Sequence, residues 1–351
     1  MRHSPTIFIV PTGIGCEIGG FAGDAIPVAK LLASASGCLV THPNVMNGGS
    51  LADTDERIYY VEGYNLDRFA KGEIGLRKVN QQKLGIIFDS GIQEELLVRH
   101  LQVADACIAS LGINIDSYVI TDEPIGVVTN NQTSGISGGY IENPSTLIEA
   151  GQKLLKKGIS AIAIVTKFPD EGNIEQIELY REGKGVDSIA GAEAVISHII
   201  SKFLRVPCAH APALMPIDLK DDLDPRAAAE EIGYTFLPSV LIGLNKAPEL
   251  IELSKSSKNI SLYPQDIESI VVPSGAFGGE AVLACIERGL RVISVKNNGT
   301  LKISNKDLNY SNVIEVENYL EAAGIILSLR EGINIKSLSR PLKSFKESQI
   351  Q

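Results

Sequence analysis

Two segments of the chain, residues 134–139 and 274–279, read S-G-x-x-G-G, and a looser relative, Thr12-Gly13-Ile14-Gly15, lies near the N-terminus. Each follows an apolar run and precedes a run of helical character. Because glycine has no Cβ, such loops let backbone N–H groups approach an anion, and a helix that starts there also favours negative charge. The three loops are therefore predicted to bind an anion.

Cationic or potentially cationic side chains are expected beside these loops. After each loop, the next strand-like run ends on one of them, namely His42, Lys167 or Lys296. In a right-handed βαβ unit, the loop and the end of the following strand lie at the same edge of the sheet. The predicted ligand-binding residues are Thr12, Gly13, Gly15, Ser134, Gly135, Gly138, Gly139, Lys167, Ser274, Gly275, Gly278, Gly279 and Lys296.

Four side chains are candidates for proton transfer, because carboxyl and imidazole groups are common general acids and bases. Glu17 lies inside the first glycine-rich loop, and His42 ends the strand predicted after it. His198 lies on the polar face of a helix predicted over residues 191–204, and His210 lies in a run of small residues and prolines.

The three histidines, together with Glu193, could also bind zinc. Their spacing includes no pair of the H-x-x-x-H type, so the sequence assigns no metal site. A metal-dependent hydrolase or lyase therefore remains an alternative.

No cofactor motif is complete in the sequence. The first loop reads Gly13-x-Gly15-x-x-x-Gly19 rather than G-x-G-x-x-G, and His42 stands where an acidic residue would bind the ribose of a dinucleotide. A P-loop sequence is also absent from the chain. The cofactor, if one is used, stays unknown.

The elements that would hold these residues alternate between apolar β-branched runs and helical runs, which is typical of an α/β protein. We expect a mostly parallel sheet with helices on both faces. It would contain repeated strand–glycine loop–helix–strand units over residues 7–42, 125–167 and 270–296. Residues 237–242 are predicted as a strand and residues 248–254 as a helix.

The length of 351 residues favours two domains. We expect an α/β domain over residues 1–217 with the first two loops, a second one over residues 218–340 with the third loop, and a polar tail over residues 341–351. The polar stretch at residues 218–225 marks the predicted boundary. The sequence leaves the formation of a homo-oligomer open.

The composition excludes several classes of protein. A formal net charge of −10 argues against binding to nucleic acid or to anionic lipid. No apolar run is long enough to span a bilayer, and the N-terminal residues do not resemble a signal peptide. Five scattered cysteines without a C-x-x-C pair indicate thiols in a reducing cytosol, so the predicted location is cytoplasmic.

Four longer segments carry a resemblance to a known family: VPTGIGCEIGGFAGDA, AEAVISHIISKFLRVPCAHAP, SGAFGGEAVLACIERGLRVISVKNN and ENYLEAAG. Together they resemble an uncharacterised, mainly cyanobacterial family that is catalogued as a domain of unknown function. The resemblance covers nearly the whole chain and implies one conserved, soluble unit. It implies no activity, catalytic residue or cofactor.

These observations favour an enzyme of unknown class that binds a small anionic metabolite, for example a phosphorylated one, at its glycine-rich loops. A non-catalytic protein that binds or senses a small molecule in the same pockets is an alternative, beside the metal-dependent enzyme. The predictions name no nucleic-acid or membrane partner.

Overall fold

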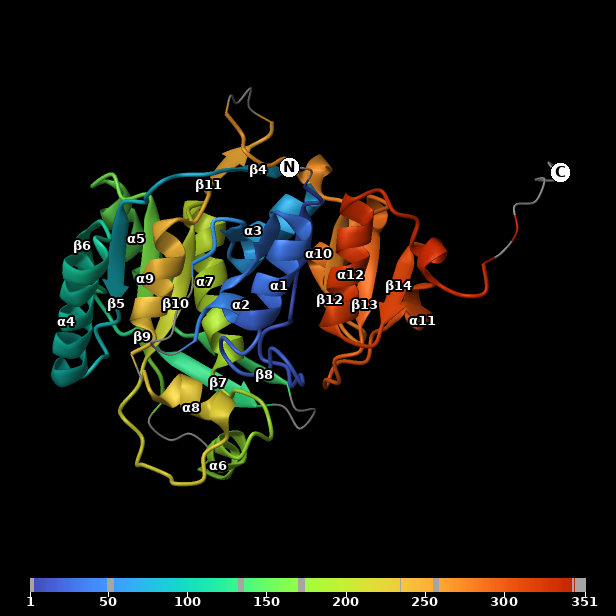
Figure 1. Cartoon of the computed structure of the whole chain (residues 1–351). Coiled ribbons are helices and arrows are strands. Elements are labelled where there is room, and N and C mark those ends of the chain that lie inside the picture. Colours follow the sequence, from blue (N-terminus) through green and yellow to red (C-terminus); the bar gives the residue numbers. More distant parts are fainter. Residues whose placement is uncertain are drawn as a thin grey trace.

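A computed structural model describes residues 3–48, 54–131, 136–169, 174–233, 235–254, 259–342 and 344 of the chain. The protein contains one parallel sheet of six strands and another of four, with helices packed against both (Figure 1). The predicted mostly parallel α/β fold is therefore confirmed.

Six strands form the larger sheet: β1 (Thr6–Phe8), β2 (Leu39–Thr41), β3 (Ile58–Tyr60), β12 (Ser269–Pro273), β13 (Arg291–Val295) and β14 (Val313–Val316). Their order is β14-β13-β12-β1-β2-β3, and all neighbours are parallel. Strand β1 thus pairs with β12 from the far end of the chain. The domain boundary predicted at residues 217–218 separates strands that lie side by side in this sheet.

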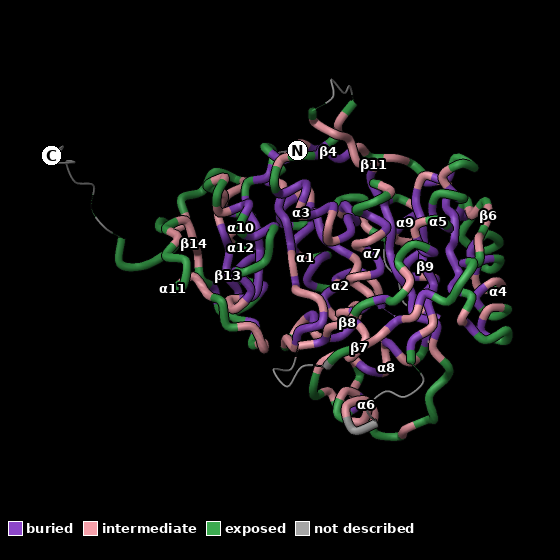
Figure 2. Tube along the Cα trace, turned by 180° about the vertical axis from the view of Figure 1, so that it is seen from behind, coloured by how far each residue is buried: buried purple, intermediate pink, exposed green. Residues whose placement is uncertain are grey.

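Helices cover both faces of the larger sheet because successive side chains of a strand point to opposite faces. Phe8 packs in one core with helices α1 (Ile26–Ser36) and α12 (Tyr319–Arg330). Its neighbour Ile7 packs in another core with α3 (Gly63–Lys71) and α10 (Glu280–Glu287). Figure 2 shows the buried residues gathered around the strands and the exposed residues at the periphery.

Four strands form the smaller sheet: β5 (Leu84–Phe88), β6 (Ile115–Ile120), β9 (Ala161–Lys167) and β10 (Cys208–Ala213). Their order is β10-β9-β5-β6, again all parallel. Two helices, α4 (Glu94–Leu111) and α9 (Leu237–Asn245), contribute to the core on one face. Helices α5 (Pro144–Leu155) and α7 (Ala190–Leu204) form the core on the other face.

For two segments the predicted type of secondary structure is wrong. Residues 237–242, predicted as a strand, belong to helix α9, whose buried residues Leu237, Val240, Leu241 and Leu244 follow the spacing of one helical face. Residues 248–254, predicted as a helix, contain strand β11 (Glu249–Glu252), which pairs antiparallel with β4 (Ile74–Arg77). Short apolar runs do not distinguish a buried helix from a strand, so tertiary packing decided both.

The second S-G-x-x-G-G segment does not form the predicted turn into a helix. Gly138 and Gly139 lie in β8 (Ser137–Ile141), which pairs antiparallel with β7 (Val127–Asn131); Ser134 and Gly135 lie outside the described residues. A Cβ on Gly139 would come within 2.6 Å of the Cβ of Ala192 in α7, so this glycine lets the hairpin lie against the helix. The third segment does connect β12 to α10. The predicted equivalence of the two segments, and with it the second repeated unit, is therefore wrong.

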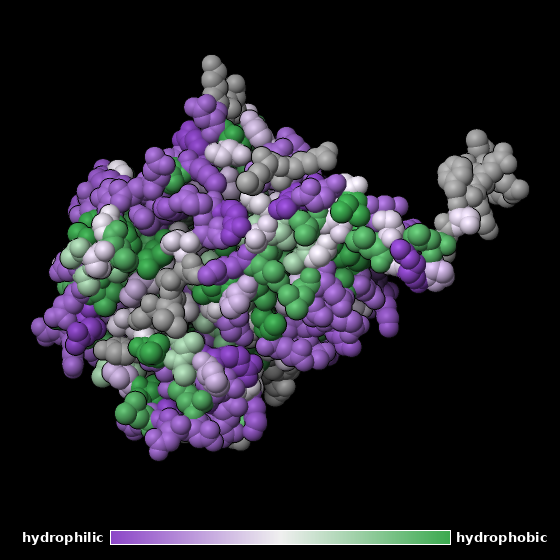
Figure 3. Space-filling view, in the orientation of Figure 1, coloured by the Kyte–Doolittle hydropathy of each residue, from purple (hydrophilic) through white to green (hydrophobic). Residues whose placement is uncertain are grey.

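The remaining short helices are α2 (Pro43–Met46), α6 (Ile174–Arg181), α8 (Pro225–Glu231) and α11 (Asn305–Leu308), with the 3-10 helices η1 (Pro264–Asp266) and η2 (Ile335–Leu338). On the outer surface, apolar side chains gather over α1 and α12 (Figure 3), where Leu320 and Leu327 are exposed. A homo-oligomer stays a prediction.

Candidate functional site: a cavity between the two sheets

A cavity of about 850 Å³ lies where the carboxyl ends of strands from both sheets meet. From the larger sheet it is lined by His42, directly after β2, and by Glu62, two residues after β3. From the smaller sheet it is lined by Phe168, directly after β9, and by Pro212, near the end of β10. Ligands of parallel α/β proteins bind at this edge of the sheet, so the cavity is the candidate functional site.

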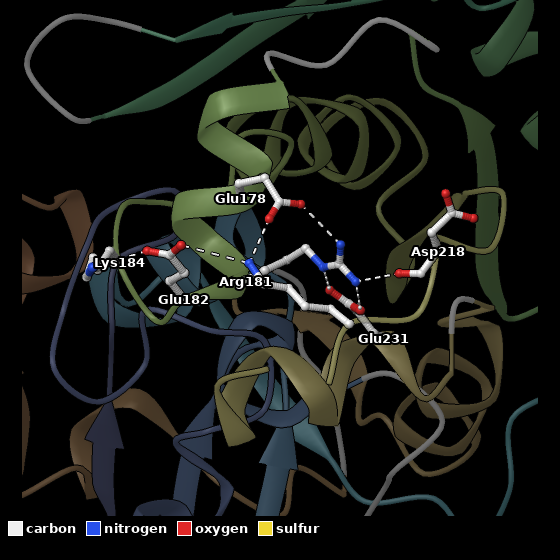
Figure 4. A network of polar contacts seen from close by, with 7 residues as sticks. Glu178, Arg181, Glu182, Lys184, Asp218 and Glu231 are labelled. Atoms are coloured by element: carbon white, nitrogen blue, oxygen red, sulfur yellow. Dashed lines mark hydrogen bonds and ion pairs between the residues drawn. The ribbon is translucent and has the colours of Figure 1, made fainter. Parts of the chain in front are cut away.

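The outer wall of the cavity consists of α6, α8 and the segment of residues 214–223. Arg181 at the end of α6 joins these parts (Figure 4). Its guanidinium donates hydrogen bonds to Glu231 at 2.9 Å, to Glu178 at 3.1 Å and to the backbone oxygen of Asp218 at 2.6 Å. Because only 7% of the Arg181 side chain is exposed, its charge serves to hold the wall together.

His210 and Glu193 form a hydrogen-bonded pair at the inner wall. Nδ1 of His210 lies 3.0 Å from Oε1 of Glu193, and Nε2 lies 2.6 Å from Oγ1 of Thr166 on β9. The His210 side chain is 2% exposed and that of Glu193 is 24% exposed. Glu193 is therefore the member of the pair that a ligand reaches more easily, while His210 orients it from behind.

His42 has a fixed hydrogen-bond role at the opposite wall. The backbone N–H of Val10, at the end of the segment that follows β1, donates to Nε2 of His42 at 3.2 Å. Burial lowers the pKa of His42 to about 4, against the opposing charge of Glu62. The ring is therefore neutral at physiological pH.

His198 of α7 pairs with Glu62 across the same cavity. Nδ1 of His198 lies 2.9 Å from Oε1 of Glu62, and the other oxygen of Glu62 accepts the N–H of Tyr64 at the start of α3. Burial lowers the pKa of His198, but the hydrogen bond and the charge of Glu62 outweigh this and raise it overall. Glu62 thus links the N-terminus of α3 to a histidine whose pKa it raises.

Two further carboxyl groups of the cavity, the half-buried Asp187 and the buried Glu230, have raised pKa values. Burial and the charge of Glu193 raise the pKa of Asp187 to about 7, although the N–H of Ile189 donates to its carboxylate at 3.0 Å. Burial and the charge of Asp187 raise the pKa of Glu230 well above its usual range. Glu230 accepts hydrogen bonds from the hydroxyl of Tyr180 at 2.6 Å and from the N–H of Ala22.

The first glycine-rich loop reaches the cavity only through Thr12. Beyond it, the backbone oxygens of Gly13 and Gly15 accept hydrogen bonds from Ser137 and Thr300, both at 2.9 Å. Glu17, the proton-transfer candidate of this loop, does not line the cavity and accepts a hydrogen bond from Asn298 at 2.7 Å. Its predicted role lacks support from this geometry.

The third loop lies outside the cavity. A Cβ on Gly275 would come within 2.1 Å of the backbone oxygen of Leu301, and one on Gly278 within 2.8 Å of Ile303, so these glycines allow a neighbouring segment to pack closely. Lys296 forms an exposed ion pair with Glu317 at 3.0 Å. Anion binding by Ser274, Gly275, Gly278, Gly279 and Lys296 stays a prediction without a cavity to support it.

Lys167 ends β9 as predicted, and its backbone N–H donates to Asp89 at 3.2 Å. Neither Lys167 nor the glycines of β8 line the cavity. Their binding role likewise stays a prediction.

Tertiary structure therefore brings together Thr12 and the three candidate histidines, but not Glu17 or the second and third loops. Sequence reasoning overlooked the cavity carboxylates Glu62, Asp187 and Glu230. The sequence could have identified Glu62 as a cavity residue, because it closely follows a strand, as His42 does. Asp187 and Glu230 had no such signal, since Asp187 precedes α7 and Glu230 lies on the short helix α8, and only the fold brings both to the cavity.

Within the described part of the chain, no group of three or more His, Cys, Asp or Glu side chains is arranged to hold a metal ion. His198 and His210 instead pair with separate carboxylates, Glu62 and Glu193, and His42 accepts the N–H of Val10. In the same ranges, no helix has the length and apolar character needed to cross a membrane.

Comparisons with known proteins agree with the sequence resemblance. Residues 5–339 match the family described as "Protein of unknown function (DUF3326)". The chain is 44% identical over 339 residues to a protein of Synechococcus sp. (strain ATCC 27144 / PCC 6301 / SAUG 1402/1) named "Uncharacterized lipoprotein syc1174_c", and the match covers 96% of this chain and 94% of that protein. No solved structure matches the chain. The protein with this cavity between two parallel sheets thus belongs to the DUF3326 family.

Proposed function

We propose that the protein is an enzyme that binds a small organic molecule in the cavity and exchanges protons with it through Glu193 and Asp187. The observation that carries the proposal is the unequal surroundings of these two carboxyl groups at one cavity. Glu193 is hydrogen-bonded to His210, whereas Asp187 is half-buried and has its pKa raised to about 7. Two carboxyl groups in unequal surroundings at one cavity are typical of an acid–base pair.

In this proposal Glu193 accepts a proton and Asp187 supplies one. His210 acts as a positioning residue, because its hydrogen bonds to Thr166 and Glu193 hold the carboxylate in one orientation. His42 and His198 remain in the proposed site as cavity residues, and Glu17 does not.

The cavity supports a neutral ligand better than the anion predicted from the glycine loops. Arg181 and Lys220, cationic residues at its outer wall, both form ion pairs with carboxylates of the wall, at 2.9 Å and 2.6 Å. Apolar side chains such as Leu214, Met215 and Ile217 line the same region. The proposed ligand therefore has an apolar body and uncharged polar groups.

A metabolite extract incubated with the full chain in heavy water tests the proposal. We expect mass spectrometry to find a compound that is consumed or gains deuterium with the wild-type protein, and much less so with Glu193→Gln or Asp187→Asn. Glu17→Gln, which removes a carboxylate outside the cavity, serves as the matched control. An extract unchanged by the wild type would favour the non-catalytic alternative, and a change that survives in both cavity variants would contradict the assigned residues.

We also propose a cytosolic location, because all five cysteines are free, as expected in a reducing compartment. The Synechococcus relative is named a lipoprotein, so fractionation of cells that express the full chain is informative. Recovery with the membranes would contradict the proposal.

A further inference from the structure

The hydrogen bond between Val10 and His42 determines which ring nitrogen of His42 carries the proton. A backbone N–H can only donate, so Nε2 must be the unprotonated acceptor. In a neutral imidazole the proton then resides on Nδ1. His42 is therefore a hydrogen-bond donor at Nδ1.

The donor has no partner within the described residues, although the residue is 7% exposed and lines the cavity. The hydrogen bond from the N–H of Val10 to Nε2 holds the ring in place. Asn44 donates a hydrogen bond to the backbone oxygen of the same Val10 at 3.4 Å. Because His42 lines the cavity, a ligand that displaces water there must supply an acceptor for this N–H, since a polar group that loses its hydrogen bond on binding costs free energy. The site thus calls for an acceptor atom in the cavity.

We infer that the ligand of this cavity is a carbonyl compound with an apolar body, whose oxygen accepts the Nδ1–H of His42. The inference rests on the proposed function and adds the class of ligand. An amine is a poor match, because a protonated amine has only donors to offer. A carboxylate ligand is also disfavoured, because Arg181 and Lys220 of the outer wall already form ion pairs with carboxylates of the wall.

The position of His42 also assigns a direction to the ligand. His42 belongs to the edge of the larger sheet, whereas Glu193 and its partner His210 belong to the side of the smaller sheet. A ligand that reaches both has its carbonyl oxygen at His42 and its proton-exchanging group at Glu193. A neutral imidazole donor would polarise the carbonyl while remaining uncharged, as His42 is over the whole physiological range.

Two probes of the same shape test the inference: N-cyclohexylacetamide, which offers a carbonyl oxygen, and cyclohexylamine, which is a protonated donor at neutral pH. NMR titration of the full chain with labelled histidines reports binding through the signals of His42, His198 and His210. We expect the amide to bind more tightly than the amine and to shift the Nδ1 signal of His42.

His42→Gln and His42→Ala separate the hydrogen bond from folding. Glutamine can accept from Val10 and still donate through its amide, so it should retain part of the preference for the amide probe. Alanine should weaken amide binding by about tenfold, the effect of one lost hydrogen bond. His100→Gln, which changes a buried histidine of α4 outside the cavity, is the control and should leave binding unchanged.

The outcomes distinguish this inference from the proposed function. If the amine binds as well as the amide, or if both His42 variants leave amide binding unchanged, the ligand class is wrong while the cavity site stands. If neither probe shifts any cavity histidine, both are contradicted. If His42 carries its proton on Nε2 at neutral pH, the inference fails on its first step.

Discussion

Asp187 lies beside Glu193 at the start of α7, and burial together with the charge of Glu193 raises the pKa of Asp187 to about 7. Asp187 accepts the N–H of Ile189, the residue that caps this helix, so the carboxyl group is held where the helix begins. The local structure of α7 therefore presents two interacting carboxyl groups to one cavity.

The first prediction concerns the dependence of stability on pH. An unfolded aspartate has a pKa of about 3.9, so between about pH 4 and pH 7 the folded state binds more protons at Asp187 than the unfolded state does. This contribution to stability is therefore present at low pH and is lost as the pH rises through the folded pKa. Asp187→Asn should raise the free energy of unfolding relative to the wild type by on the order of 2 kcal/mol at pH 8, and by little at pH 4.

Urea denaturation of both proteins at several pH values measures this difference. Asparagine keeps an oxygen for the N–H of Ile189, so the cap of α7 is retained. A difference between the two proteins that does not grow with pH would show that Asp187 is ionised in the folded protein at neutral pH.

The second prediction concerns His198. Glu62→Gln removes the negative charge beside the imidazole but keeps an oxygen for the N–H of Tyr64. The pKa of His198 should fall, because burial then acts without the opposing carboxylate. The stabilisation from this pair, which is fully present below the unfolded pKa of histidine and lost as the pH rises through the folded pKa, should disappear with it.

An NMR titration of the His198 ring measures that pKa directly. His100, which has no carboxylate partner in the described structure, serves as an internal reference, and its titration should not change. An unchanged midpoint for His198 would mean that Glu62 does not control its charge.

The third prediction concerns Gly275 in the third glycine-rich loop. Gly275→Ala should destabilise the protein by on the order of 1–3 kcal/mol, because its Cβ would lie 2.1 Å from the backbone oxygen of Leu301. A Cβ added to Gly324 of α12 would meet only open space, so Gly324→Ala should be neutral or stabilising by up to about 1 kcal/mol. Thermal or urea unfolding compares the two variants, and equal effects would contradict the packing role of Gly275.

The fourth prediction concerns the outer wall of the cavity. Arg181→Ala removes the guanidinium that joins α6 to Glu231 of α8 and to the backbone at Asp218. Backbone amides of α6 should then exchange with solvent about tenfold faster, because this wall opens more often. Lys184→Ala removes only an exposed ion pair with Glu182 and should change little. Equal exchange in both variants would show that Arg181 does not hold the wall.

The sequence alone determined the class of the fold and much of its local structure. Alternating apolar and helical runs predicted the parallel sheets, and the position of His42 after a strand predicted its place at a carboxyl edge. The turn from β12 into α10 followed from glycine at residues 274–279. These features depend on neighbours in the chain, so a local pattern is sufficient to predict them.

Tertiary structure decided the order of the strands and the composition of the site. Strand β1 pairs with β12 because burial of apolar surface over both ends of the chain favours one sheet, and no local pattern records that pairing. Tertiary packing also decided the structure of residues 237–242, which form a helix because one face of that helix is buried. Asp187, Glu193, Glu230 and Glu62 come together only through packing, and burial and neighbouring charges raise the pKa of Asp187 and of Glu230. Burial and electrostatic coupling act between groups that are close in space, so only the folded chain defines them.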